Sequence, residues 1–98
     1  MNFRLIYPKD LRSVLRTESA VLIDVRTREQ YKKGHWPGAR NFPYEELERW
    51  EKMIPGHKLV IFYCDHGGNS MQLAHRFGMQ GYKVASVVGG YPSMKGYM

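Results

Sequence analysis

The sequence contains a single cysteine, Cys64, and no long hydrophobic run. One cysteine excludes an internal disulfide framework, a Cys-x-x-Cys redox pair and a zinc site built from several cysteines. No stretch approaches the ~18 consecutive apolar residues of a membrane-spanning helix. Charge and proline interrupt the N-terminal apolar residues before they reach the length of a secretory signal. We therefore expect a cytoplasmic protein with no membrane contact, in which the thiol stays reduced.

Acidic residues are also few. The chain has nine Asp and Glu and fifteen Lys and Arg, which gives a formal net charge of +6. An excess of positive charge favours anionic partners in general. The basic residues are scattered from Arg4 to Lys95, however, and their longest run is Lys32-Lys33. Without a basic stripe interleaved with aromatic residues, we expect no nucleic-acid partner.

The chain has only 98 residues, and a chain of this length buries just roughly 60 to 70% of its unfolded surface. Its composition, 43% hydrophobic and 13% aromatic, is that of a globular protein, since disordered chains lack this much apolar surface. We expect one domain over residues 1–98, without repeats or linkers, and a monomer.

Three apolar segments, at residues 20–25, 58–64 and 82–88, are predicted to be strands. They are short and rich in β-branched or aromatic side chains. The first two are continuous and do not alternate with polar residues, which is typical of strands covered on both faces in a mainly parallel sheet. Residues 4–7 are predicted to add a short edge strand.

Helical signals separate the strands. Thr27 and Gln30 have the spacing of a capping box at the start of a short helix, and Ser70 is predicted to cap a longer one. Alternation of strands and helices indicates an α/β sandwich around a parallel sheet. Helices are expected from Pro8 onward and over residues 27–34, 44–53 and 71–80.

The loop after the 58–64 strand is the candidate site. Functional groups gather beyond the carboxyl ends of strands in an open parallel sheet, and Cys64 lies at such an end. Two adjacent glycines permit positive φ, so the amides of residues 65–70 are expected to surround the sulfur as an anion-binding nest. The dipole of the next helix adds to this effect and favours the thiolate, the reactive form of cysteine. We predict Cys64 as catalytic and six loop residues as substrate-binding: Asp65, His66, Gly67, Gly68, Asn69 and Ser70.

Some of these residue types also have plain structural roles. A free cysteine at a strand end can be a small buried hydrophobe. The His66 imidazole, inside the candidate loop, either tunes Cys64 or points to solvent. The Cys64-x-His66 pair resembles half of a metal site, but His35, His57 and His75 have no ligand-like spacing, so we expect no metal.

Asp24 and Arg26 end the 20–25 strand, at the same sheet edge as Cys64 if the strands are parallel. A catalytic carboxylate is one interpretation. A polar group that holds loops together by hydrogen bonds is the interpretation that we favour. His35 is likewise expected to lock a loop and not to act as a general base.

Several separated motifs occur in a fixed order: Leu22-Ile23-Asp24-Val25-Arg26 with Glu29 and Tyr31, then Gly34-His35-Trp36-Pro37-Gly38-Ala39-Arg40-Asn41-Phe42-Pro43, then Val60 to Cys64, and finally Gly81-Tyr82 and Gly89-Gly90-Tyr91. From about Leu5 to Tyr97 the sequence thereby resembles the rhodanese-like domains, most closely their small single-domain sulfurtransferases. The resemblance implies a three-layer sandwich with a five-stranded, mainly parallel sheet flanked by helices. It also implies that Cys64 accepts a sulfane sulfur as a persulfide and passes it to cyanide, a small thiol or a partner protein's thiol, without a cofactor. Because the chain has no second thiol, the sulfur must leave it.

The loop departs from the family pattern at one position. Rhodaneses typically read Cys-x-x-Gly-x-Arg followed by Ser or Thr; Gly67 and Ser70 match these offsets, but Asn69 replaces the arginine. Related phosphatases and arsenate reductases use a loop one residue longer that ends in arginine, and a phosphate dianion would find no bidentate cation here.

Thiosulfate is also a dianion, and Asp65 lies next to the nucleophile in sequence. We therefore expect persulfide chemistry without efficient thiosulfate turnover. The alternative is a non-catalytic rhodanese-like module that binds a partner or relays sulfur.

Overall fold

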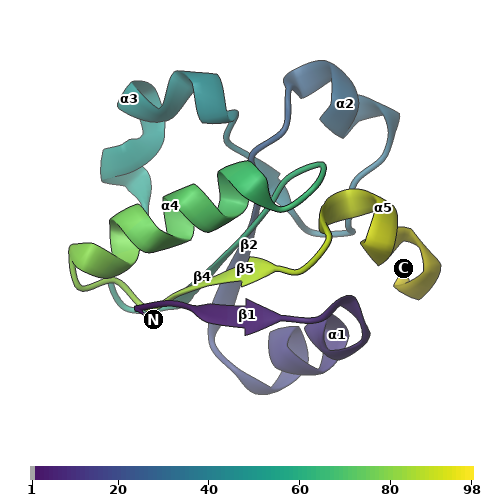
Figure 1. Cartoon of the computed structure of the whole chain (residues 1–98), viewed down its shortest axis with the longest axis horizontal. Coiled ribbons are helices and arrows are strands. Elements are labelled where there is room, and N and C mark those ends of the chain that lie inside the picture. Colours follow the sequence, from purple (N-terminus) through teal and green to yellow (C-terminus); the bar gives the residue numbers. More distant parts are fainter. Residues whose placement is uncertain (1) are drawn as a thin grey trace.

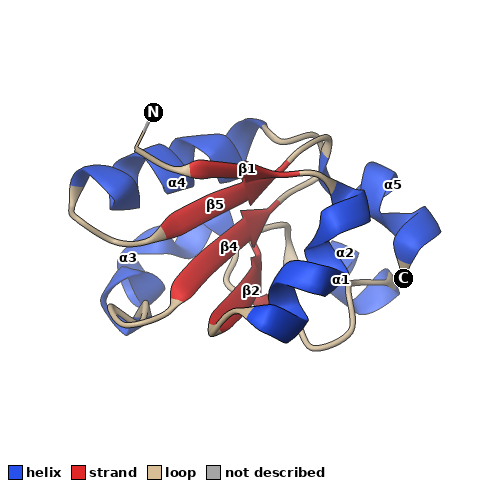
Figure 2. Cartoon of the chain, turned by 90° about the horizontal axis from the view of Figure 1, so that it is seen from below, coloured by secondary structure: helices blue, strands red, loops and turns tan. Residues whose placement is uncertain are grey.

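The computed structural model describes residues 2–98 and has a five-stranded sheet between two layers of helices (Figures 1 and 2). The strands lie in the order β1-β5-β4-β2-β3, and all four neighbouring pairs are parallel. The expected α/β sandwich is therefore confirmed. The strands are β1 (Arg4–Ile6), β2 (Ala20–Asp24), β3 (Arg40–Asn41), β4 (Leu59–Tyr63) and β5 (Val84–Val87).

Helices cover both faces of the sheet. On one face lie α4 (Gly68–Met79) and the short α3 (Leu47–Trp50), and on the other lie α1 (Pro8–Thr17) and α5 (Gly90–Met94) (Figure 1). Helix α2 (Arg28–Lys33) follows β2. Three 3-10 turns complete the described secondary structure: η1 (Tyr44–Glu46), η2 (Glu51–Met53) and η3 (Lys95–Tyr97).

The central strand β4 serves both halves of the core. Leu59, Ile61 and Tyr63 pack on the α1 face, whereas Val60 and Phe62 pack on the α4 face, because successive side chains of a strand point in opposite directions. All five are buried, which explains why the sequence of this strand is continuously apolar. The next side chain after the strand, the candidate nucleophile, continues the alternation onto the α4 face.

Two predicted helices differ from the structure. Residues 44–53 form a 3-10 turn, one α-helical turn and a second 3-10 turn instead of one helix. Trp50 explains the break in part, because its buried indole N–H donates to the Pro43 carbonyl at 2.8 Å and fixes the segment by tertiary contact.

The second difference lies at the start of α4. Gly67 occupies the cap position with φ 97° and the helix begins at Gly68, so Ser70 is not the cap as predicted. Its hydroxyl instead donates to the Gly67 carbonyl at 3.2 Å. In contrast, the predicted capping box of Thr27 and Gln30 is present at α2.

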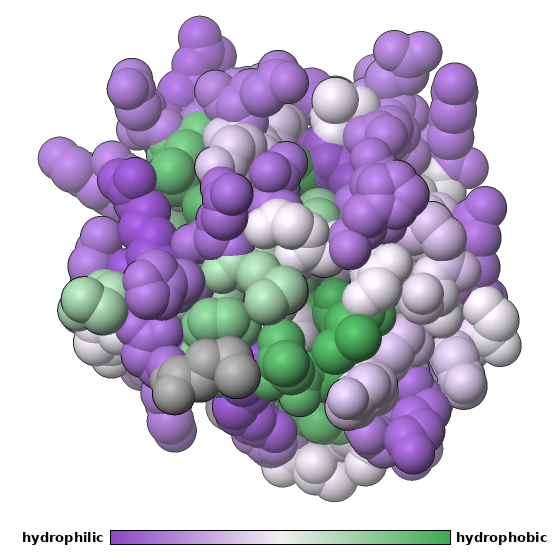
Figure 3. All heavy atoms as spheres, in the orientation of Figure 1, coloured by the Kyte–Doolittle hydropathy of each residue, from purple (hydrophilic) through white to green (hydrophobic). Residues whose placement is uncertain are grey.

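The surface is mostly polar on the face shown in Figure 3, with apolar side chains gathered near the middle, over the edge strand β1. Leu5 of this strand is 40% exposed. Among residues 2–98, no helix has both the length and the apolar character needed to cross a membrane.

Candidate active site

Cys64 lies at the carboxyl end of the central strand and is 5% exposed. Its Sγ accepts a hydrogen bond from the Gly67 amide at 3.0 Å and a longer one from the Ser70 amide at 3.5 Å. Of the amides expected around the sulfur, these two therefore reach Sγ itself. Backbone N–H groups stabilise negative charge that develops at an atom toward which they point.

The loop reaches this geometry because Gly67 is in the left-handed region, which a side chain would disfavour. That conformation turns the Gly67 amide toward the sulfur and starts α4 at the next residue. The first amides of a helix have no intrahelical acceptor, so those of Gly68 and Asn69 add donors beside the sulfur at the positive end of the helix dipole.

Two buried hydroxyls lie beneath the sulfur. Ser70 Oγ is 3.5 Å from Cys64 Sγ and 2.7 Å from Ser86 Oγ on β5. Both serines are fully buried. Sequence reasoning missed Ser86, because it lies sixteen residues from Ser70 and no local pattern marks it.

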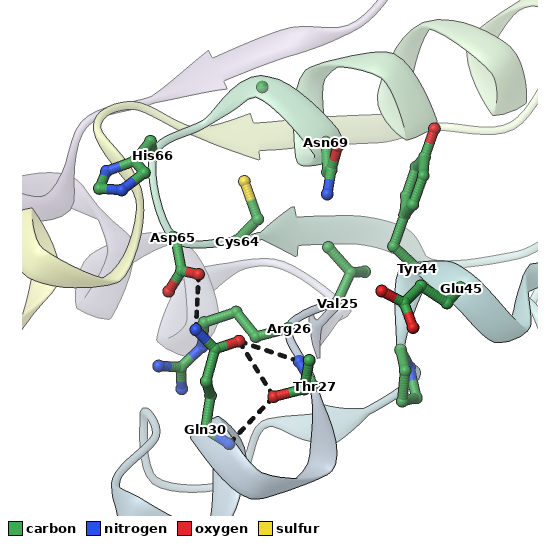
Figure 4. A pocket seen from close by; sticks show the side chains of 12 residues that line it. Val25, Arg26, Thr27, Gln30, Tyr44, Glu45, Cys64, Asp65, His66 and Asn69 are labelled. Carbon is green, nitrogen blue, oxygen red and sulfur yellow. Dashed lines mark hydrogen bonds between the residues drawn. The ribbon is translucent and has the colours of Figure 1, made fainter.

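The two titratable residues that follow the nucleophile point away from the sulfur (Figure 4). The Asp65 carboxylate accepts a hydrogen bond from Gln30 Nε2 of α2 at 2.7 Å. The His66 side chain is exposed, which agrees with the solvent-facing alternative. The Asn69 side chain points toward the pocket in the same view.

An open pocket of about 670 Å³ lies above Cys64. Five of the seven predicted site residues line this pocket. The other two, Gly67 and Ser70, do not line it but donate hydrogen bonds to the sulfur through their amides. Apart from Arg26, which was expected at this sheet edge, sequence reasoning missed the pocket wall that the segments after β2 and β3 provide. The available signal was position, because these segments follow strands parallel to β4 and so meet at the same sheet edge. The lining residues are Val25, Arg26, Thr27, Gln30, Pro43, Tyr44, Glu45, Cys64, Asp65, His66, Gly68 and Asn69.

Asp24 and Arg26 hold the wall of the pocket together, as predicted. Arg26 Nη2 donates to Asp24 Oδ2 and to the Gly34 carbonyl, both at 2.7 Å. The guanidinium also lies 3.9 Å from the centre of the Tyr91 ring. Burial lowers the pKa of Arg26, but its hydrogen bonds and attraction to Asp24 outweigh burial and raise that pKa above its usual value.

The positive charge of Arg26 is consequently not available to a bound anion. Its guanidinium points away from the Cys64 sulfur (Figure 4), and Asp24 neutralises it in a pair whose side chains are 5% and 0% exposed. Among the lining residues the remaining full charges are the carboxylates of Glu45 and Asp65. The described pocket therefore offers amide donors without a free lysine or arginine.

His35 has the loop-locking role expected of it. Its Nδ1 lies 2.8 Å from the Tyr31 carbonyl, and the two rings stack with centres 3.7 Å apart. Within residues 2–98, no group of three or more His, Cys, Asp or Glu side chains is placed to hold a metal ion.

Comparisons with known proteins agree on one family. The family model described as Rhodanese-like domain matches residues 7–96. The thiosulfate sulfurtransferase GlpE of Actinobacillus succinogenes is 33% identical over 92 residues, which are 93% of this chain and 83% of that protein. A tRNA sulfurtransferase of Pyrobaculum aerophilum is 32% identical over 80 residues, but these cover 82% of this chain and only 16% of that protein.

Solved structures show the same fold. A rhodanese-related protein from Thermoplasma volcanium superposes with a TM-score of 0.87 at 24% identity, over 97% of this chain and 93% of that chain. The protein CoADR-RHD of Bacillus anthracis matches with a TM-score of 0.82 at 27% identity, over 91% of this chain and 16% of its own length.

Proposed function

The chain belongs to the rhodanese-like domain family, and from this membership we propose that it transfers a sulfane sulfur through a persulfide on Cys64. The observation that carries the proposal is the environment of the Cys64 sulfur. This sulfur lies at the base of an open pocket and accepts hydrogen bonds from two backbone amides. Such a site suits a thiolate nucleophile and the anion that it becomes.

In the first step the Cys64 thiolate attacks the outer sulfur of the donor. A new S–S bond forms to Cys64 while the S–S bond inside the donor breaks, and the rest of the donor leaves with the electron pair, as sulfite does from thiosulfate. The negative charge moves to the terminal sulfur of the persulfide. The free amides of Gly68 and Asn69 at the start of α4 support it there, as donors in an oxyanion hole do.

In the second step a nucleophilic acceptor takes the terminal sulfur. Cyanide, a small thiolate or the thiolate of a partner protein attacks that sulfur, and the electrons of the breaking S–S bond return to Cys64 as a thiolate. This sequence needs neither a metal nor an organic cofactor, and it gives ping-pong kinetics. The proposal includes a cytoplasmic location, where thiols stay reduced.

Intact mass spectrometry after treatment with a sulfane donor tests the proposal. We expect one added sulfur on the native chain and none on the Cys64→Ser variant. An addition that survives Cys64→Ser would overturn the assignment of the nucleophile. A folded native chain that gains no sulfur from thiosulfate, polysulfide or a low-molecular-weight persulfide would overturn the catalytic proposal and favour the second candidate, a non-catalytic binding or relay module.

The charge of the pocket argues against thiosulfate as an efficient donor. A dianion meets the carboxylates of Glu45 and Asp65, while Arg26 is paired with Asp24. The same observation favours the second candidate, because a module that receives sulfur from a protein partner does not need a dianion site.

Restoring a cation at the loop tests this argument. We expect Asn69→Arg to raise kcat/KM for thiosulfate about tenfold, since a charge-assisted hydrogen bond contributes roughly 1.5–3 kcal/mol and exposure reduces that gain. Asn69→Gln is the matched control, because it keeps a neutral amide at this position. Equal turnover by the native chain and both variants would show that the missing cation does not limit thiosulfate use.

A further inference from the structure

Ser86 places a hydroxyl inside the apolar core beneath the active site. It lies on β5, opposite Phe62 of β4, on the face covered by α4, and it is fully buried. A buried hydroxyl is unfavourable unless it is hydrogen-bonded. Its partner is Ser70 Oγ at 2.7 Å, and Ser70 in turn lies beside the sulfur.

A count of protons fixes the direction of this hydrogen bond. Each serine hydroxyl has one proton to donate and two lone pairs to accept. Among residues 2–98, Ser70 Oγ is the hydrogen-bond partner of the Ser86 side chain, whereas Ser70 Oγ also contacts the Gly67 carbonyl and Cys64 Sγ. If Ser70 donated to Ser86, the Ser86 proton would be buried without an acceptor. Ser86 is therefore the donor, and the Ser70 proton is left for Gly67 or Cys64.

The two charge states of the sulfur place that proton differently. When Cys64 is a thiol, its S–H points to Ser70 Oγ at 3.5 Å and Ser70 donates to the Gly67 carbonyl at 3.2 Å. When the sulfur is an anion, the Ser70 O–H can turn to it. The Gly67 carbonyl then keeps a partner, because it also accepts the Met71 amide at 3.0 Å. The change therefore leaves no buried group unsatisfied.

We propose that Ser86 is a positioning residue that holds the Ser70 hydroxyl as a switchable donor to the Cys64 sulfur. In the anionic state Sγ accepts the Gly67 amide, the Ser70 amide and the Ser70 hydroxyl, and Ser86 keeps the last of these pointing toward the sulfur by occupying one lone pair of Ser70. The inference deepens the proposed function, on which its catalytic relevance rests, by assigning a second hydroxyl to control of the nucleophile.

Other charged and titratable groups line the pocket around Cys64. They are Arg26 after β2, Tyr44 and Glu45 of η1, and Asp65 and His66 of the loop. None of them contacts Ser86 by a hydrogen bond within the described residues, and all are unchanged in the variants below. A difference between variants in the pH dependence of Cys64 therefore reports on the hydroxyl pair.

The test is the rate of Cys64 alkylation by iodoacetamide as a function of pH, with urea unfolding to verify that each variant is folded. We expect Ser86→Ala to slow alkylation about 3- to 10-fold below the midpoint and to move the midpoint up by about 0.5 to 1 pH unit, the effect of one hydrogen bond lost from the anion. Ser93→Ala, which removes a hydroxyl at the exposed end of α5, is the control and is expected to leave the profile unchanged.

A double variant separates positioning from packing. Because Ser86 acts through Ser70, the pH profile of Ser70→Ala combined with Ser86→Ala should equal that of Ser70→Ala alone. Additive shifts, or a Ser86→Ala profile that matches the native one, would overturn the proposal. Alkylation needs no sulfur donor, so this outcome is distinct from a failure of sulfur loading, which would overturn the proposed function and leave the hydroxyl pair intact.

Discussion

Two neighbouring loops at the carboxyl edge of the sheet use opposite electrostatic designs. Asp24, the last residue of β2, is fully buried, and its carboxylate accepts hydrogen bonds from the backbone amide, Nε and Nη2 of Arg26. After β4, no fully charged group among residues 2–98 makes a hydrogen bond to the Cys64 sulfur, which accepts hydrogen bonds from backbone amides instead. The first loop satisfies its charges internally, whereas the second has donors in excess of acceptors.

This difference distinguishes a framework loop from a site for an incoming anion. Breaking a buried ion pair leaves an uncompensated charge and is strongly unfavourable, so the β2 loop resists change. Free amides at a helix start remain ready for a ligand or for the negative charge of a reaction. Because the two loops are adjacent, the rigid loop after β2 forms a wall of the pocket in which the loop after β4 places its donors.

The largest expected effect comes from breaking the framework charge pair. We expect Asp24→Leu to lower the free energy of unfolding by about 3–5 kcal/mol, because Arg26 is left buried and unpaired. Adding Arg26→Met should recover part of this loss, although the Arg26 amide still lacks its acceptor. Urea denaturation measures both.

The exposed pair of Arg4 and Glu18 provides the control for that experiment. Glu18→Ala should leave the urea midpoint unchanged, since solvent screens this pair. If the single and double variants at Asp24 and Arg26 were equally unstable, the ion pair would not be what holds the β2 loop, and the contrast between the two loops would fail.

The next effect concerns the contact that supports the reactive loop. A Cβ on Gly90 would lie 2.3 Å from the Asp65 carbonyl oxygen, and Gly90 has φ +70°. We expect Gly90→Ala to cost about 2–4 kcal/mol of folding stability from backbone strain and overpacking. It should also slow sulfur loading of Cys64, because the neighbouring Tyr91 amide holds the Cys64 carbonyl at 2.8 Å.

Gly38→Ala is the matched control, since Gly38 has φ +88° but open space around its Cβ position. It should cost only the backbone strain of about 1–2 kcal/mol and leave sulfur loading unchanged. Thermal unfolding and the rate of sulfur addition measure the two effects. Equal results for the two glycines would mean that the Gly90 contact does not shape the reactive loop.

The smallest effect tests the link between the loops. Gln30 holds the Asp65 carboxylate at 2.7 Å and takes part in the capping box of α2. We expect Gln30→Ala to cost about 0.5–1 kcal/mol of stability. We also expect it to slow alkylation of Cys64 several-fold, because the released carboxylate can turn toward the sulfur and disfavour the thiolate.

Thr27→Ala removes the same capping box but leaves Gln30 in place. Its stability should fall by a similar amount, with little change in the alkylation rate of Cys64. If the two variants slowed alkylation equally, helix capping and not the position of Asp65 would explain the effect.

Local sequence patterns predicted much of the fold. The runs around β2 and β4 are apolar on both faces, which is typical of a covered sheet, and Thr27 and Gln30 satisfy the start of α2 by contacts within four residues. The predicted start of α4 was wrong because the helix start depends on the backbone conformation of Gly67. Contacts of the loop with the sulfur and with β5 together determine that conformation. Ser70 therefore contacts the sulfur and does not cap the helix.

The candidate site divides in the same way. The order of residues along the chain shows that the only thiol follows an apolar strand, that glycines come next and that neither lysine nor arginine lies in that loop, because these are properties of adjacent residues. Local sequence could not show that Gln30 turns Asp65 aside or that Ser86 lies against Ser70. These contacts join residues far apart in the chain, and they exist because parallel pairing of β2, β4 and β5 brings their ends to one edge.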